Sequence, residues 1–120
     1  MDERKGMKLI AQERQNQIEK CGFSLEFDKG WTKGQLLEAA YFSIHQAELK
    51  MYGRTVGSVP WPKKMGIYFK RKIEKKSVVE QYTVAGALFW AENDRTQSHE
   101  WDTHINVMAS IIDILLNIIN

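Results

Sequence analysis

"SVVEQYTVAGALFWAENDR", residues 77–95, is the most informative segment of the sequence for predicting the fold. Ser77 and Glu80 form a capping-box pattern, in which two side chains bond the backbone N–H groups at a helix start. The residues that follow are apolar on nearly every side of a helix, which predicts a central helix over 78–95. Gly86 stands between two alanines and permits close approach of another helix or of a flat ligand.

Two helices are expected on the N-terminal side of this segment. The first covers residues 3–21, because apolar residues recur there at helical spacing and Gly22 follows as a helix-ending residue. The second begins at a further capping-box pattern, Thr32 with Gln35, and extends to about Met51. Both helices have one apolar face, which is typical of helices that pack on a shared core.

The last helix is expected over 99–119, with Ser98 as its cap. Its apolar residues cover more than one stripe: Val107, Met108, Ile111, Ile112, Leu115, Leu116, Ile118 and Ile119. Since a surface helix needs an apolar arc of only about 100°, the excess indicates deep burial or self-association. We therefore expect one all-α domain over residues 1–120, a bundle of about four helices, with 99–119 as the oligomerisation helix of a homo-oligomer.

"VPWPKKMGIYFKRKIEKK", residues 59–76, separates the second and third helices and contains seven Lys or Arg and one Glu. Its two prolines predict a long basic, aromatic loop, in which residues 65–73 are also compatible with a short strand. Residues 63–76 carry a net charge of +6, so the rest of the chain carries −4. Such a local field favours an anionic partner, although a basic loop that only aids solubility has the same composition.

Composition also indicates the cellular compartment in which the protein is expected. A single cysteine, Cys21, excludes an internal disulfide, and no signal-peptide pattern opens the sequence. The apolar run at 105–119 is too short to span a membrane and is interrupted by Asn106 and Asp113. We expect a cytoplasmic protein without a membrane partner.

No complete catalytic or metal-binding motif is present. "HEWDTH", residues 99–104, resembles the zinc-protease motif H-E-x-x-H, but its histidines are five residues apart and point about 140° from one another around a helix. All-α nucleotide pyrophosphohydrolases hold Mg²⁺ with paired acids, whereas "AENDR" places Arg95 three residues after Glu92. No catalytic residue, metal ligand or cofactor is assigned.

Three residues have both a structural and a binding interpretation. Arg14 and Glu92 lie on apolar helix faces, where an unpaired charge is unfavourable, so they either pair with each other or line a ligand pocket together with Arg95. Trp61 stands between two prolines and is either a core residue or a platform on which a base stacks.

Several short motifs occur in an order that resembles a family of small helical proteins common in phages and prophages. They are "ERQNQIEKCGF", Asp28, "GQLLEAA", "WP" and "VAGALFWAENDR", and the similarity spans about residues 13–95. The matching residues are Glu13, Arg14, Gln17, Ile18, Gly22, Asp28, Gly34, Leu36, Ala39, Ala40, Trp61, Pro62, Ala85, Gly86, Ala87, Leu88, Ala91, Glu92 and Arg95. Lys63 stands where the family has a second Trp. The family is in turn faintly similar to ryanodine-receptor-type repeat domains, which have been suggested to sense nucleotide-derived signals.

The resemblance implies a phage-type accessory protein, and the basic, aromatic stretch adds a preference for phosphate and bases. The expected function is non-enzymatic capture of an anionic nucleotide-like small molecule, such as an immune signalling nucleotide. The candidate ligand-binding residues are Arg14, Trp61, Lys63, Lys64, Tyr68, Lys70, Arg71, Lys72, Glu92 and Arg95. Two alternatives remain open: a nucleic-acid- or protein-binding module that uses the same strip, and a nucleotide pyrophosphohydrolase.

Overall fold

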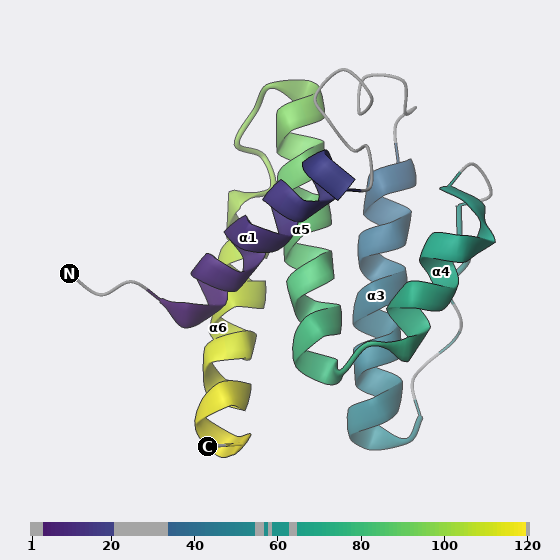
Figure 1. The fold of residues 1–120 in the computed structure, drawn as a ribbon, viewed down its shortest axis with the longest axis vertical. Coiled ribbons are helices and arrows are strands. Elements are labelled where there is room, and N and C mark those ends of the chain that lie inside the picture. The colour runs from purple at the N-terminus through teal and green to yellow at the C-terminus, as the bar shows by residue number, and fades with distance from the viewer. Residues whose placement is uncertain (1–3, 21–33, 55–56, 58, 63–64, 120) are drawn as a thin grey trace.

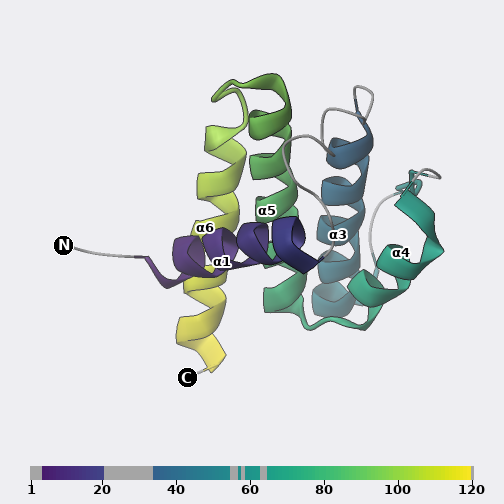
Figure 2. The same ribbon diagram turned by 45° about the horizontal axis from the view of Figure 1, so that its top comes forward.

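The computed structural model describes residues 4–20, 34–54, 57, 59–62 and 65–119, and within them the chain forms five α-helices (Figure 1). The expected all-α class is therefore confirmed, with one helix more than the four that the sequence predicts. Helices α3 (Gln35–Tyr52), α5 (Val78–Thr96) and α6 (Asp102–Ile119) lie side by side as one layer. Helix α1 (Lys5–Lys20) crosses that layer, and α4 (Gly66–Lys75) lies beside α3, as a second view also shows (Figure 2).

Helix α5 is the centre of the fold, as the apolar pattern predicts. It packs against α1, α3 and α6, and nearly every side chain from Gln81 to Asn93 is buried. The predicted capping box is confirmed: the Ser77 hydroxyl accepts a hydrogen bond from the Glu80 N–H, and the Glu80 carboxylate accepts one from the Ser77 N–H. The expected bounds of this helix differ from the observed ones by a single residue.

Small residues let the helices approach closely. A Cβ at Gly86 would lie 2.6 Å from Cδ1 of Ile10, so α1 crosses α5 at this glycine, which confirms the helix-packing interpretation. The backbone of Gly6 lies directly against the carbonyl group of Ala109 on α6. The same Gly6 donates its N–H to the Asp113 carboxylate at 2.7 Å, which places a negative charge at the start of α1.

Helix α6 begins three residues later than the sequence predicts. Residues 99–101 form a turn instead, because the buried Asn93 binds it from α5. The Asn93 side chain accepts a hydrogen bond from the Trp101 N–H at 2.9 Å and donates one to the Asp102 carboxylate at 2.8 Å. A polar side chain thus sets the helix start, so the expected cap at Ser98 was wrong.

The basic stretch contains the fifth helix, α4, where the sequence predicts a loop or a short strand. Phe69 and Ile73 are buried at a spacing of one helical turn, while Gly66 and Lys75 mark the ends of the helix. Lys and Arg have good helix propensity, so the charged residues between these positions do not oppose the helix. Helix α4 packs on α3, and Gln81 of α5 donates a hydrogen bond to the Ile73 carbonyl at 2.9 Å.

The predicted end of α3 agrees with the structure, but its predicted start does not, because the helix begins at Gln35 after Gly34, whose φ of 102° is not helical. Helix α3 ends at Tyr52, and Gly53 follows with a φ of 76°, which is the expected helix-ending conformation. The predicted cap Thr32 and the helix-ending Gly22 lie outside the described residues. None of the described helices combines the length and the apolar character that crossing a membrane requires.

Candidate ligand-binding site

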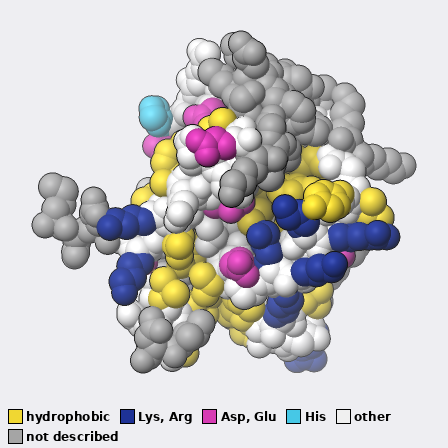
Figure 3. Space-filling model, in the orientation of Figure 1, with side chains coloured by type: hydrophobic (Ala, Val, Ile, Leu, Met, Phe, Trp, Pro, Cys, Tyr) yellow, Lys and Arg dark blue, Asp and Glu magenta, His cyan; other side chains and the backbone are white. Residues whose placement is uncertain are grey.

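Helix α4 buries Phe69 and Ile73 and leaves most of its cations exposed. Arg71, Lys72 and Lys75 are exposed, and Lys70 is half-buried with its ammonium group 5.8 Å from the centre of the Phe42 ring. The space-filling view shows Lys and Arg side chains gathered over α4 and the adjoining part of α3 (Figure 3). An amphipathic helix therefore concentrates the charge that the sequence places in a loop.

Trp61 is a packing residue that fixes α4 on α3. Its ring meets Phe42 at 5.1 Å and 70° and Phe69 at 5.8 Å between ring centres, and its indole N–H donates to the Gly66 carbonyl at 2.9 Å. With the ring between two core residues and its polar edge bonded, the core interpretation of Trp61 is the one the contacts favour.

Tyr68 is the exposed aromatic residue of α4. It is 75% exposed, and the ammonium group of Lys72, one helical turn later, lies 5.6 Å from its ring centre. A ring with an adjacent cation can stack on a base and meet a phosphate at once. Lys63 and Lys64, which belong to the same sequence prediction, lie outside the described residues.

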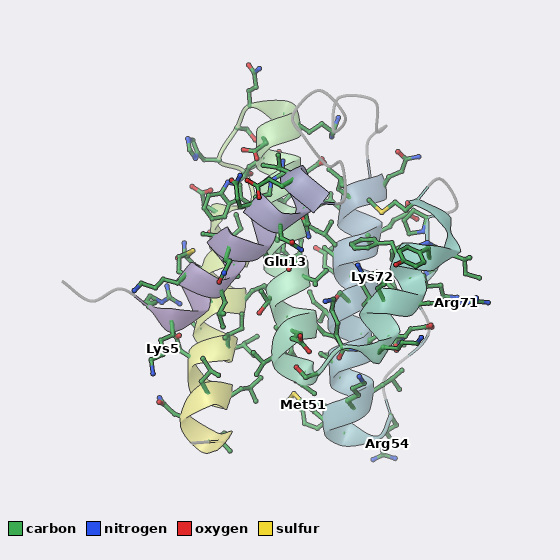
Figure 4. All side chains as sticks on the ribbon, in the orientation of Figure 1. Lys5, Glu13, Met51, Arg54, Arg71 and Lys72 are labelled. Atoms are coloured by element: carbon green, nitrogen blue, oxygen red, sulfur yellow. The ribbon has the colours of Figure 1, made fainter. Side chains whose placement is uncertain are left out.

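A cavity of about 320 Å³ lies between α1 and α5. Its lining combines an apolar floor with amides and carboxylates: Leu9, Gln12, Glu13, Asn16, Val79, Glu80 and Thr83. In Figure 4, Glu13 on α1 and Lys72 on α4 lie on the same face of the molecule, whereas Arg71 points outward from it. The charge of Lys72 also acts on the Glu13 carboxyl, so the basic helix lies near the cavity.

The two carboxyl groups of this cavity differ in their environment. Burial raises the pKa of Glu13 above its usual value, and the positive charges of Lys76 and Lys72 partly oppose the rise. Hydrogen bonds from the backbone and the side chain of Ser77 lower the pKa of Glu80. Glu80 is thus occupied by the helix cap, while the half-buried Glu13 faces the cavity.

The charged residues at the far end of α5 form pairs that differ from the expected one. Arg14 is 4% exposed and binds the Asp94 carboxylate through Nε and Nη2, each at 3.0 Å. Glu92 accepts two hydrogen bonds from Arg95, at 2.8 Å and 2.7 Å, one helical turn away. The prediction that Arg14 and Glu92 are buried charges is confirmed, but the carboxylate that we find on Arg14 belongs to Asp94.

A second cavity, of about 250 Å³, lies at the turn before α6 and is lined by Asp94, His99 and Asp102 among others. His99 is almost fully exposed and lies 3.2 Å from the Asp102 carboxylate, whereas His104 packs against Phe89 and Trp101. The two histidines therefore face different surroundings. Within the described part of the chain, no group of three or more His, Cys, Asp or Glu is placed to hold a metal ion.

Glu13 was not among the site residues that the sequence predicts. The spacing of residues on α1 is what could have indicated Glu13. It lies four residues after Leu9 and four before the fully buried Gln17, so it belongs to the edge of the buried face of α1. An acidic residue at such an edge is indistinguishable from a solvated one until the neighbouring helix is placed.

No family model matches the chain, and comparisons with curated proteins and with solved structures likewise gave no match.

Proposed function

We propose that this protein binds an anionic, base-containing small molecule of the nucleotide class and does not transform it. The observation that carries the proposal is the exposed Tyr68–Lys72 pair of α4, next to a cavity that holds a half-buried carboxyl. Aromatic rings stack on bases, and Lys or Arg side chains meet phosphate oxygens. Arg71 and Lys75 provide further positive charge on the same helix.

The biological role that we propose is sequestration of a nucleotide signal, as an anti-defence protein of a phage would do. Its support is the ordered set of motifs from Glu13 to Arg95 that resembles small phage and prophage proteins. Binding without turnover suits this role, because a sequestered signal is removed from its receptor by mass action alone.

The contacts of Trp61 change which aromatic residue we expect to contribute most to nucleotide binding. Because the Trp61 ring is held between Phe42 and Phe69, we assign base stacking to Tyr68. Replacement of Tyr68 with Ala should weaken nucleotide binding by about 1–3 kcal/mol, the usual range for one stacked base. The matched control is Tyr52→Ala on α3, since Tyr52 is also largely exposed, at 67%.

The test is calorimetric titration of the wild type and both variants with mononucleotides, cyclic dinucleotides and ADP-ribose. Saturation near one ligand per protomer or per interface, with a loss in Tyr68→Ala and none in Tyr52→Ala, supports the proposal. Absence of binding to every ligand of this panel contradicts it. Release of phosphate from a nucleotide in the presence of Mg²⁺ would favour the pyrophosphohydrolase alternative instead.

A polynucleotide is the second candidate ligand, because the cations of α4 stand exposed on a convex helix. Contacts with phosphates along a strand make binding steeply dependent on salt. Four such contacts would reduce the affinity on the order of a hundredfold between about 50 and 200 mM salt. A small ligand that meets one or two cations should lose far less over the same range.

We also propose that the protein self-associates through α6. Val107, Ile114 and Ile118 are 46%, 59% and 74% exposed, and Ile111 lies half-buried among them. Their spacing of four, three and four residues is that of the seam of a coiled coil. This stripe lies apart from Ile105, Met108, Ala109 and Ile112, which face the core.

A further inference from the structure

The cavity between α1 and α5 has the composition of a site that recognises hydrogen-bonding groups. Leu9 and Val79 provide apolar surface, the amides of Gln12 and Asn16 provide donors and acceptors, and Glu13 provides an acceptor. A volume of about 320 Å³ is at the lower end of the range for ligand pockets, about 300–1,000 Å³, which suits one base better than a dinucleotide.

Glu13 is the carboxyl of this cavity that is available to a ligand. Glu80 already accepts the Ser77 N–H at 2.9 Å and is held at the start of α5. The neighbouring Gln17 is fully buried, and neither its amide nitrogen nor its amide oxygen has a hydrogen-bond partner. The side chains of Gln17 and Asn16 both lie close enough to the Glu13 carboxyl to lower its pKa against the effect of burial.

Two positive charges act on Glu13. They are Lys72 in the last turn of α4 and Lys76 immediately after that helix. A ligand whose base edge meets Glu13 can therefore keep its ring against Tyr68 and its phosphate on Lys72, since Lys72 lies 5.6 Å from the Tyr68 ring centre and also acts on Glu13. This arrangement separates the two parts of a nucleotide into an uncharged part and an anionic part.

We infer that this cavity is the base-recognition part of the ligand site, and that Glu13 makes it selective for guanine over adenine. The inference rests on the proposed function and specifies the class of ligand. An ionised carboxylate only accepts hydrogen bonds. Guanine presents two adjacent N–H donors on its pairing edge, whereas adenine presents one N–H donor beside a ring acceptor, which a carboxylate repels. The amide of Asn16 lies on the same wall and is able to donate to the guanine carbonyl.

The experiment compares GMP, AMP and inorganic pyrophosphate as ligands of the full chain by calorimetric titration. The variant is Glu13→Gln, which keeps the size of the side chain and removes its charge. The matched control is Glu19→Gln on the same helix, because Glu19 is exposed and lies outside the cavity. We expect the wild type and Glu19→Gln to prefer GMP to AMP by on the order of tenfold or more, the usual result of a two-bond contact with a base edge.

In Glu13→Gln the preference for GMP should largely disappear, while the affinity for pyrophosphate stays within about twofold of the wild type or rises, since a negative charge near the phosphate is lost.

The preference of the wild type for GMP should also fall as the pH is lowered through the raised pKa of Glu13, because the protonated carboxyl loses an acceptor. The charged groups that face Glu13 are Lys72, Lys76 and the lining residue Glu80, and Glu80 has a lowered pKa. The negative charge of Glu80 therefore persists to lower pH than that of Glu13.

Three results would overturn the inference, and they have different meanings. Equal binding of GMP and AMP by the wild type, with Tyr68→Ala still harmful, refutes base selection by Glu13 and leaves the proposed function intact. Absence of binding to all three ligands refutes the inference, and the wider panel with cyclic dinucleotides and ADP-ribose then decides whether the proposed function also fails. A GMP preference that survives in Glu13→Gln also refutes the role of this residue.

Discussion

Glu13 is a carboxyl group whose charged form the fold disfavours. Its pKa is raised mainly by burial, so the folded chain binds the proton more tightly than the unfolded chain does. Stability therefore falls as the pH rises from the ordinary range of a glutamate through the raised pKa, and it levels off above that value. A group that is held at such a disadvantage is typical of binding sites, where function and stability compete.

Replacement of Glu13 with Gln should accordingly raise the thermal midpoint at pH 7, because no charge has to be desolvated. The difference from the wild type should shrink toward pH 4, where both side chains are neutral. Thermal unfolding followed by circular dichroism between these pH values measures it, with Glu19→Gln as the exposed control. A lower midpoint of Glu13→Gln at pH 7 would show that the charge stabilises the fold.

The residues of the candidate site could be predicted in part. Tyr68 and Lys72 follow from the composition of one stretch, and Arg14 and Glu92 follow from charges on apolar helix faces. The partner of Arg14 could not be predicted, because Glu92 and Asp94 are two residues apart on α5 and the crossing of α1 decides which carboxylate meets the guanidinium. The crossing of α1 over α5 and α6 depends on Gly86 and Gly6.

For single helices, the apolar pattern and the capping residues determine which helices can be predicted from the sequence. Helices α1, α3, α5 and α6 are long and carry several buried residues each, so their existence could be predicted. Helix α4 has ten residues, of which Phe69 and Ile73 are the buried ones, and it follows two prolines. Two apolar positions are too few to reveal helical periodicity within a run of charges.

The helix crossings at Gly6 and Gly86 should respond differently to alanine. At Gly86 the added methyl group meets the side chain of Ile10, which can shift, and alanine is the better helix former by about 1 kcal/mol. At Gly6 it meets the backbone of Ala109, which cannot move without displacing α6. Urea unfolding should therefore show a loss of about 3 kcal/mol or more for Gly6→Ala and a smaller loss for Gly86→Ala. The reverse order would mean that α1 does not cross as described.

At the scale of the whole molecule, charge is distributed unevenly. Residues 63–76 carry +6 and the rest of the chain −4, and the structure gathers much of the positive part on α4. Such a local excess of positive charge attracts anions toward α4.

Self-association through α6 is the prediction that concerns the whole assembly. Ile114→Glu places a charge within the exposed apolar stripe and should dissociate the oligomer, because an unpaired charge in an apolar interface is unfavourable. Asn117→Glu is the control, since Asn117 is exposed on the same helix but lies outside the stripe. Light scattering at tens of micromolar protein measures the mass. A wild type that is monomeric under these conditions would exclude the proposed interface.

The contact between Gly6 and Asp113 joins residues 107 positions apart in the chain. During synthesis α1 emerges from the ribosome before α6, the helix that receives its N-terminal end. Helix α1 also supplies Glu13 to the cavity and Arg14 to Asp94. The position of α1, and with it the cavity and the pair of Arg14 with Asp94, is consequently completed only once α6 has been made.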